Sequence, residues 1–206
     1  MIEPLEALER LQVGNRRFIE GRQSHREITL ADQLEALARE QRPFAIIIGC
    51  SDSRVPAEIV FDQGIGDLFV IRVAGNIVAP SQIGSVEFAA EQFDTRLVVV
   101  LGHSNCGAVT ATLEELQRPS ERRSPNLHAI VDRIRPSVQD LLGTELDEDP
   151  EALLRAGVRA NVRSSVAELR HGSTILEDLI REDRLMVVGA EYSLTTGLVE
   201  FFEGVG

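Results

Sequence analysis

The chain has 206 residues, of which 43% are hydrophobic and 26% are charged, a composition that suits a globular protein with a sizeable core. Its net charge of −12 at pH 7 repels phosphate groups, which excludes nucleic acid as a partner. No apolar run approaches the ~18 residues that a membrane-spanning helix needs. The N-terminus has acidic residues where a signal peptide has basic ones, so we expect a cytoplasmic protein with no membrane partner.

The N-terminal part of the chain predicts helices. Apolar residues recur at helical spacing over residues 4–20, which is typical of an amphipathic helix. A second helix is expected to begin at Thr29, which forms the pattern of a capping box with Asp32. We expect one domain over residues 1–206, with residues 1–41 as an N-terminal helical arm.

Four short apolar runs, rich in β-branched residues, predict strands that are buried on both faces. These runs span residues 44–48, 68–73, 97–101 and 185–188. Helical stretches are expected between them, over residues 56–61, 82–93, 106–116 and a long segment of about 126–180. Strands that alternate with helices indicate an α/β fold, in which helices flank a mostly parallel sheet.

Polar side chains follow the first and the third of these runs. Cys50, Asp52 and Arg54 come after the first run, and His103 and Cys106 come after the third. In open α/β sheets, ligands bind beyond the carboxyl ends of the strands. We therefore expect two thiols, an imidazole, a carboxylate and a guanidinium to share one small volume.

These residue types favour a zinc site. Zinc prefers tetrahedral coordination by thiolate sulfur and imidazole nitrogen, and a catalytic zinc keeps three protein ligands and one open position. Cys50, His103 and Cys106 supply three ligands, while Asp52 could compete as a fourth. A cysteine at a strand end is often only a small buried residue. Here both cysteines of the chain fall in strand-end loops, and one belongs to a His-x-x-Cys pattern.

The two loops, CSDSR at 50–54 and GHSNCG at 102–107, closely resemble the β-carbonic anhydrase family, whose pattern is Cys-x-Asp-x-Arg followed by His-x-x-Cys. The resemblance extends through residues 66–76 and 84–88 and, more weakly, 189–192 and 197–202. It implies a four-stranded parallel core, often extended by a fifth strand near the C-terminus. It also implies a homodimer or a dimer of dimers, with one zinc ion per subunit on Cys50, His103 and Cys106.

The resemblance further implies roles for residues around the metal. Asp52 and Arg54 would form a hydrogen-bonded dyad. The residues that would line the substrate pocket are Gln41, Phe69 and Phe88, with the backbone N–H of Gly107 beside them and Ala74 completing an apolar lining. In the family, part of this lining comes from the partner subunit. Without the resemblance, the two phenylalanines could equally be core residues, and Gln41 could simply end a helix.

The implied activity is the reversible hydration of carbon dioxide to bicarbonate and a proton by zinc-bound hydroxide. Asp52 can accept a hydrogen bond from that hydroxide, and Arg54 can hold the carboxylate with two N–H donors. In carbonic anhydrases whose zinc is held by three histidines, the pKa of the bound water is about 7. Two thiolates donate more charge than imidazoles, so we expect a somewhat higher pKa and a preference for alkaline conditions.

Two regulatory features of the family bear on this chain. If Asp52 leaves Arg54 and binds zinc, the water position is blocked, and some members show such a closed state at lower pH. Some members also bind bicarbonate at an inhibitory site that uses a tryptophan three residues before the first cysteine. Here that residue is Ile47, although Arg72 and Tyr192 match other parts of the site. We therefore expect no inhibition by bicarbonate.

Three other functions fit parts of the sequence. Hydrolysis of carbonyl sulfide or carbon disulfide uses the same zinc ligands in relatives of the family, and only the pocket separates these linear substrates from carbon dioxide. A non-enzymatic zinc protein could use the same fold, but it would need neither Asp52 nor Arg54. A thiol redox protein is disfavoured, because the cysteines do not form a Cys-x-x-Cys motif.

Overall fold

The structure is a computed structural model, and it describes residues 2–23, 35, 37–119 and 124–205. The expected capping box of Thr29 and Asp32 lies outside the described residues. None of the described helices is both long and apolar enough to cross a lipid bilayer.

Five strands form one sheet in the order β2-β1-β3-β4-β5. Their bounds are β1 Ala45–Gly49, β2 Leu68–Arg72, β3 Leu97–His103, β4 Met186–Tyr192 and β5 Val199–Glu203. Strands β1 to β4 run parallel to one another, whereas β5 is antiparallel to β4. The four apolar runs are thus confirmed as parallel strands. Every residue of β1 and β3 is buried, which is why their sequences are continuously apolar. The expectation of burial on both faces is wrong for β2, whose residues are half-buried or exposed because it lies at the edge of the sheet.

Helices connect and flank the strands. Their bounds are α1 Pro4–Ile19, α3 Ala57–Val60, α4 Pro80–Gln92, α5 Gly107–Gln117, α6 Pro125–Val138, α7 Pro150–His171 and α8 Thr174–Arg181. Short 3₁₀ turns form at η1 Ala74–Asn76, η2 Gln139–Leu141 and η3 Glu145–Glu148. The long helical segment expected over residues 126–180 is therefore three helices, because side chains cap two new starts. Asp149 accepts hydrogen bonds from the first turn of α7, and Ser173 accepts one from Leu176 in α8.

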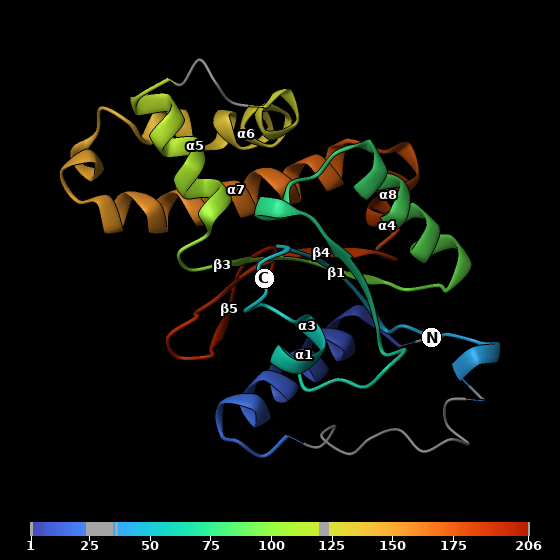
Figure 1. The fold of residues 1–206 in the computed structure, drawn as a ribbon. Coiled ribbons are helices and arrows are strands. Elements are labelled where there is room, and N and C mark those ends of the chain that lie inside the picture. The colour runs from blue at the N-terminus through green and yellow to red at the C-terminus, as the bar shows by residue number, and fades with distance from the viewer. Residues whose placement is uncertain (1, 24–34, 36, 120–123, 206) are drawn as a thin grey trace.

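The sheet separates two layers of helices (Figure 1). Helices α1 and α3 cover one face, and α4, α7 and α8 cover the other. Alternate residues of the central strands pack toward the two layers, as the pleat of a strand requires. Ile47 and Val99 belong to the core cluster under α1, whereas Ile46 and Val98 belong to the cluster that contains Val162 of α7. Helices α5 and α6 pack beside α7.

Two strand glycines let α7 approach the sheet closely. A Cβ atom added at Gly102 of β3 would lie 2.5 Å from Cγ2 of Val162, and one added at Gly189 of β4 would lie 2.7 Å from Cγ1 of the same valine. Any larger residue at either position would push the helix away. The position of α7 is thus fixed against β3 and β4 by direct packing, and residues of α7 reach the candidate site described next.

Candidate metal centre

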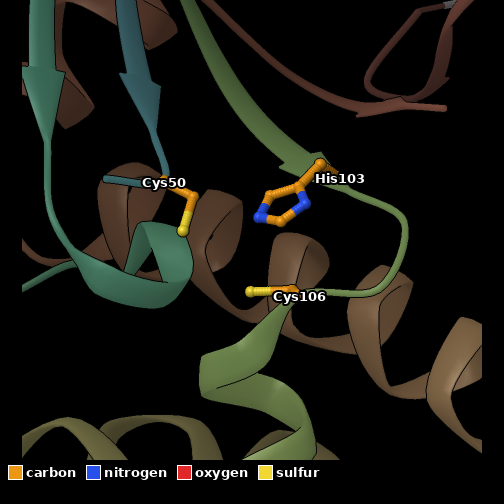
Figure 2. A group of neighbouring side chains, drawn as sticks. All are labelled: Cys50, His103 and Cys106. Carbon is orange, nitrogen blue, oxygen red and sulfur yellow. The ribbon is translucent and has the colours of Figure 1, made fainter. Parts of the chain in front are cut away.

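Three side chains from three separate elements converge at the carboxyl ends of the central strands. Cys50 directly follows β1, His103 is the last residue of β3, and Cys106 directly precedes α5. Their sulfur and ring nitrogen atoms all lie within 4.8 Å of one another, and all three residues are buried. Figure 2 shows the three side chains pointing toward a common centre. The structure therefore brings together the three residues that the sequence nominated as metal ligands.

The sheet register explains why Cys50 and His103 meet. Strands β1 and β3 are parallel neighbours, and Gly49 pairs with Leu101, so both strands deliver their next residues to the same edge. Cys106 returns to that edge through a tight turn in which Asn105 has a φ of 56°. Cys106 occupies the N-cap position of α5 without a capping hydrogen bond from its side chain, and the helix dipole there favours a thiolate.

The hydrogen bonds of His103 leave one ring nitrogen for a metal. Its Nδ1 lies 2.9 Å from the carbonyl oxygen of Ser104. Because a carbonyl oxygen can only accept, Nδ1 carries the ring proton and donates a hydrogen bond to it. Its Nε2 is buried and has no hydrogen-bond partner among the described residues. Histidines that bind metals commonly donate their other N–H in this way. Two sulfurs and one neutral imidazole nitrogen form the donor set that zinc prefers, so the residues present fit a zinc ion.

The two cysteines share negative charge. A hydrogen bond from Cys106 lowers the pKa of Cys50 to about 4, with smaller contributions from His103 and from backbone N–H groups, although burial opposes the shift. The pKa of Cys106 is raised, because its protonated thiol is stabilised by the hydrogen bond that it donates to Cys50 and because burial disfavours its thiolate. The pair thus carries one negative charge readily, and a coordinated cation would supply the positive charge that favours ionisation of the second thiol.

Asp52 is held by Arg54 in a bidentate pair. The Nε and Nη2 atoms of Arg54 donate to Oδ1 and Oδ2 at 2.9 Å and 2.7 Å, and the backbone N–H of Arg54 donates to Oδ1 at 3.0 Å. These hydrogen bonds hold the pKa of Asp52 well below its usual range. Oδ2 lies 3.9 Å from Nε2 of His103, so an ionised, oriented carboxylate stands beside the three candidate ligands.

Arg72 holds the loop that carries Cys50 and Asp52. It is the last residue of β2, and its guanidinium donates to the carbonyl oxygen of Cys50 at 3.1 Å and to that of Asp52 at 2.6 Å. The sequence suggested Arg72 only as part of an inhibitory site. Its place at the end of a strand next to β1 is a signal for this contact, because the ends of neighbouring parallel strands lie together.

The expected pocket residues divide into two groups. Ala74 begins η1, whose next residue contacts Cys50, and Gly107 directly follows Cys106, so both adjoin the three ligands. Phe69 lies near the amino end of β2, where it pairs with Ile46. Phe88 is 51% exposed, and the centroid of its ring lies 6.3 Å from the ring centroid of Phe69.

Gln41 belongs to the distant group with these phenylalanines. It precedes β1, whereas Cys50 follows it, and a strand of five residues spans roughly 16 Å. Within one chain, the structure does not bring Gln41, Phe69 and Phe88 to the metal ligands.

Comparison with known proteins assigns the chain to a family. The family model described as carbonic anhydrase matches residues 45–199, which begin with β1 and include every candidate metal ligand. The chain is 38% identical to the carbonic anhydrase of Mycolicibacterium smegmatis, over 98% of this chain and 95% of that protein. It belongs to the carbonic anhydrase family. Carbonic anhydrase 2 of Mycobacterium tuberculosis is 37% identical over the same shares of the two chains.

Solved structures give the class of this carbonic anhydrase. The β-carbonic anhydrase CcaA matches with a TM-score of 0.76 and 27% identity, over 97% of this chain and 92% of that one. A tetrameric β-carbonic anhydrase from Sordaria macrospora matches with a TM-score of 0.73 and 26% identity, over 82% and 85%. The β class implied by the sequence motifs is therefore confirmed. This carbonic anhydrase catalyses the reversible hydration of carbon dioxide to bicarbonate and a proton.

Proposed function

We propose that this carbonic anhydrase works with one zinc ion per subunit, held by Cys50, His103 and Cys106. The observation that carries the proposal is the buried Nε2 of His103, which lacks a hydrogen-bond partner among the described residues and lies within 4.8 Å of two cysteine sulfurs. When bound, zinc lowers the pKa of a coordinated water and so supplies a nucleophile near neutral pH. The protein then has to orient that nucleophile and bind carbon dioxide beside it.

In this proposal Asp52 orients the attacking water. Because Arg54 keeps its carboxylate ionised, Asp52 can accept a hydrogen bond from the water and leave an oxygen lone pair facing the substrate. The bidentate grip of Arg54 also keeps the carboxylate from rotating toward the cation. If that grip is released, Asp52 becomes a competing fourth ligand, which would switch the enzyme off.

The substrate pocket is completed, in this proposal, by a second copy of the chain in a dimer or a dimer of dimers. Ala74 and the backbone N–H of Gly107 adjoin the metal ligands in the same subunit, and that N–H can stabilise charge on the substrate oxygen. Gln41, Phe69 and Phe88 lie too far away to do so in their own subunit. Strand β2 is an edge strand of the sheet, and the exposed ring of Phe88 lies beside it, which supports this edge as the contact between copies.

We also propose that residues 1–206 form one domain that works in the cytoplasm. Helix α1 is tied to distant parts of the chain, because Asn15 donates to the carbonyl oxygens of Val60 and Gly197. This supports an N-terminal arm that packs on the domain. Two thiolate ligands are kept reduced in the cytoplasm, which supports that location.

The test is the metal content of the purified protein, measured together with carbon dioxide hydration across pH. We expect about one zinc per chain, activity that rises toward alkaline pH, and much slower hydrolysis of carbonyl sulfide. Cys106→Ser is expected to lose both zinc and activity. A zinc-replete protein that leaves carbon dioxide unhydrated at every pH, or a protein that never binds zinc stoichiometrically, would overturn the proposal.

A further inference from the structure

Cys50 receives a backbone hydrogen bond from a left-handed turn. The N–H of Gly75 donates to Sγ of Cys50 at 3.3 Å. Gly75 and the next residue, Asn76, have φ values of 69° and 44°, in the left-handed region that glycine adopts readily and that asparagine adopts more often than most other residues. The direction of this N–H therefore depends on the conformation of this turn.

Helix α7 maintains this turn with two buried side chains. Nδ2 of Asn161 donates to the carbonyl oxygen of Gly75 at 2.7 Å, and Oγ of Ser165 donates to that of Asn76 at 3.1 Å. Asn161 and Ser165 are four residues apart on one face of the helix. Both are almost fully buried, so each of these hydrogen bonds is shielded from water.

The turn has little freedom to move away from Cys50. A Cβ atom added at Gly75 would lie 2.8 Å from Cδ1 of Ile134 and 2.9 Å from Cβ of Ala108. On the other side, α7 is fixed against the sheet, because Val162, which follows Asn161, packs onto Gly102 and Gly189. The amide of Asn161 thus connects a rigidly packed helix to the residue whose N–H contacts a candidate metal ligand.

We infer that Asn161 is a positioning residue, which acts through Gly75 to hold an N–H on the sulfur of Cys50 and so limits the charge that this thiolate donates to the metal. An N–H dipole stabilises negative charge on sulfur. With less charge donated by one of its two thiolates, the cation stays more electrophilic. A buried asparagine inside a helix costs free energy unless it is hydrogen-bonded, and a leucine there would simply add to the core. The inference rests on the proposed zinc site and deepens it.

The test uses the full-length protein with cobalt(II) in place of zinc, because sulfur-to-cobalt charge transfer absorbs light at an energy that reports on the thiolate. Asn161→Leu keeps the size of the side chain and removes the donor. We expect the charge-transfer band to move to longer wavelength, since a thiolate without its N–H gives up charge more easily.

Asn15→Leu is the matched control. Asn15 is also a buried asparagine, and its Nδ2 also donates to backbone carbonyl oxygens, but these belong to Val60 and Gly197. This variant is expected to lose stability while its cobalt band stays at the wild-type wavelength. If the two variants lose similar stability and both keep the wild-type band, Asn161 only packs the fold and the inference is wrong.

A measurement on the wild-type protein covers the case in which Asn161→Leu does not fold. With an NMR-active cadmium isotope at the site, a hydrogen bond from Gly75 to Cys50 is expected to give a scalar coupling between the metal and the Gly75 amide proton. A missing coupling, in a protein that binds cadmium, would overturn the inference alone. A wild-type protein that binds none of zinc, cobalt and cadmium would instead overturn the proposed metal site.

Discussion

Asp52 accepts three hydrogen bonds from a single residue, Arg54. In the proposed zinc site, this would let a carboxylate stand beside the cation without binding it. Both oxygens are engaged by the guanidinium, and the low pKa of Asp52 keeps them charged. The same pair would be of little consequence on an open surface. Beside Cys50 and His103, it fixes the orientation of a charged acceptor, which is what a reacting water needs.

Replacing that acceptor gives the first prediction. Asp52→Asn keeps the shape of the side chain but removes its charge and one of its two accepting oxygens, so we expect kcat/KM for carbon dioxide hydration to fall by about 10²–10⁴-fold. Zinc content should remain at the wild-type level, because the variant keeps all three proposed ligands. Stopped-flow hydration assays and metal analysis of the same sample check this. Full activity in the variant would remove Asp52 from the mechanism.

Arg72 acts on the same loop through its backbone. Its two hydrogen bonds to the carbonyl oxygens of Cys50 and Asp52 need a forked group, so Arg72→Lys keeps the charge but cannot make both with the same geometry. We expect Arg72→Lys and Arg72→Gln both to lower kcat/KM roughly 10–100-fold, as is typical when residues that orient metal ligands are changed.

The control for Arg72 is Arg17→Gln. Arg17 likewise reaches a carbonyl oxygen, that of Asp62, but it lies in α1, outside the candidate site. This variant should keep wild-type kcat/KM. If kcat/KM falls equally in the Arg17 and Arg72 variants, both arginines contribute only to folding.

At the scale of whole elements, burial decides what could be predicted from the sequence. Strands β1 and β3 are buried throughout, so continuous apolar runs predicted them and placed Cys50 and His103 at their ends. Strand β5 is an antiparallel edge strand with only its first residue fully buried. It has no such run, and only the resemblance to a known family indicated it.

The contacts of the candidate site were predictable to different degrees. Ligands at strand ends follow from the topology of a parallel sheet. Asn161 could not be found in this way, because a polar residue within a helix has the same sequence pattern whether it faces water or a buried turn. Its role depends on packing between α7 and η1, which connects residues that are far apart in the chain.

The contact between α7 and β4 also carries a titratable group. Burial raises the pKa of Glu191 despite its ion pair with Arg159, whose Nε lies 3.5 Å away. The folded protein therefore binds this proton more tightly than the unfolded chain, in which the pKa is about 4.3. The contribution of Glu191 to the stability of the fold is therefore fully present below that value, and it is lost as pH rises through the raised pKa of the folded state.

Glu191→Gln tests this directly. The free energy of unfolding of the wild type, relative to that of the variant, should decrease as pH rises above about 4 and level off once Glu191 is ionised in the folded state. Urea unfolding at a series of pH values measures it. Parallel stability curves for the two proteins over this range would contradict the raised pKa.

At the scale of the whole molecule, the proposed shared pocket would draw on both ends of the sheet. The candidate ligands lie at the carboxyl ends of β1 and β3, whereas Gln41 lies at the amino end of β1. An open cavity of about 1090 Å³ lies there, lined by Gln41 and by apolar residues such as Phe44, Leu68 and Phe93. Two copies joined along β2 in a symmetric dimer would each place this end of one chain near the carboxyl end of the other.

Mixing two inactive variants tests whether subunits share a site. Cys106→Ser cannot hold the metal but keeps Gln41, while Gln41→Ala keeps the metal ligands but loses the pocket amide. Each homodimer should be inactive or strongly impaired. Once the subunits exchange, half of the dimers are mixed and each contains one intact site, so about a quarter of the wild-type activity should return.

Two surface variants test whether the edge near β2 joins the subunits. Leu127 is as exposed as Phe88 but lies on α6, so Leu127→Glu should leave the oligomer intact. Phe88→Glu should shift sedimentation toward the monomer and lower activity, with zinc retained by Cys50, His103 and Cys106. If mixed and unmixed samples are equally inactive although subunits exchange, Gln41 acts within its own chain or not at all, and the shared pocket is wrong.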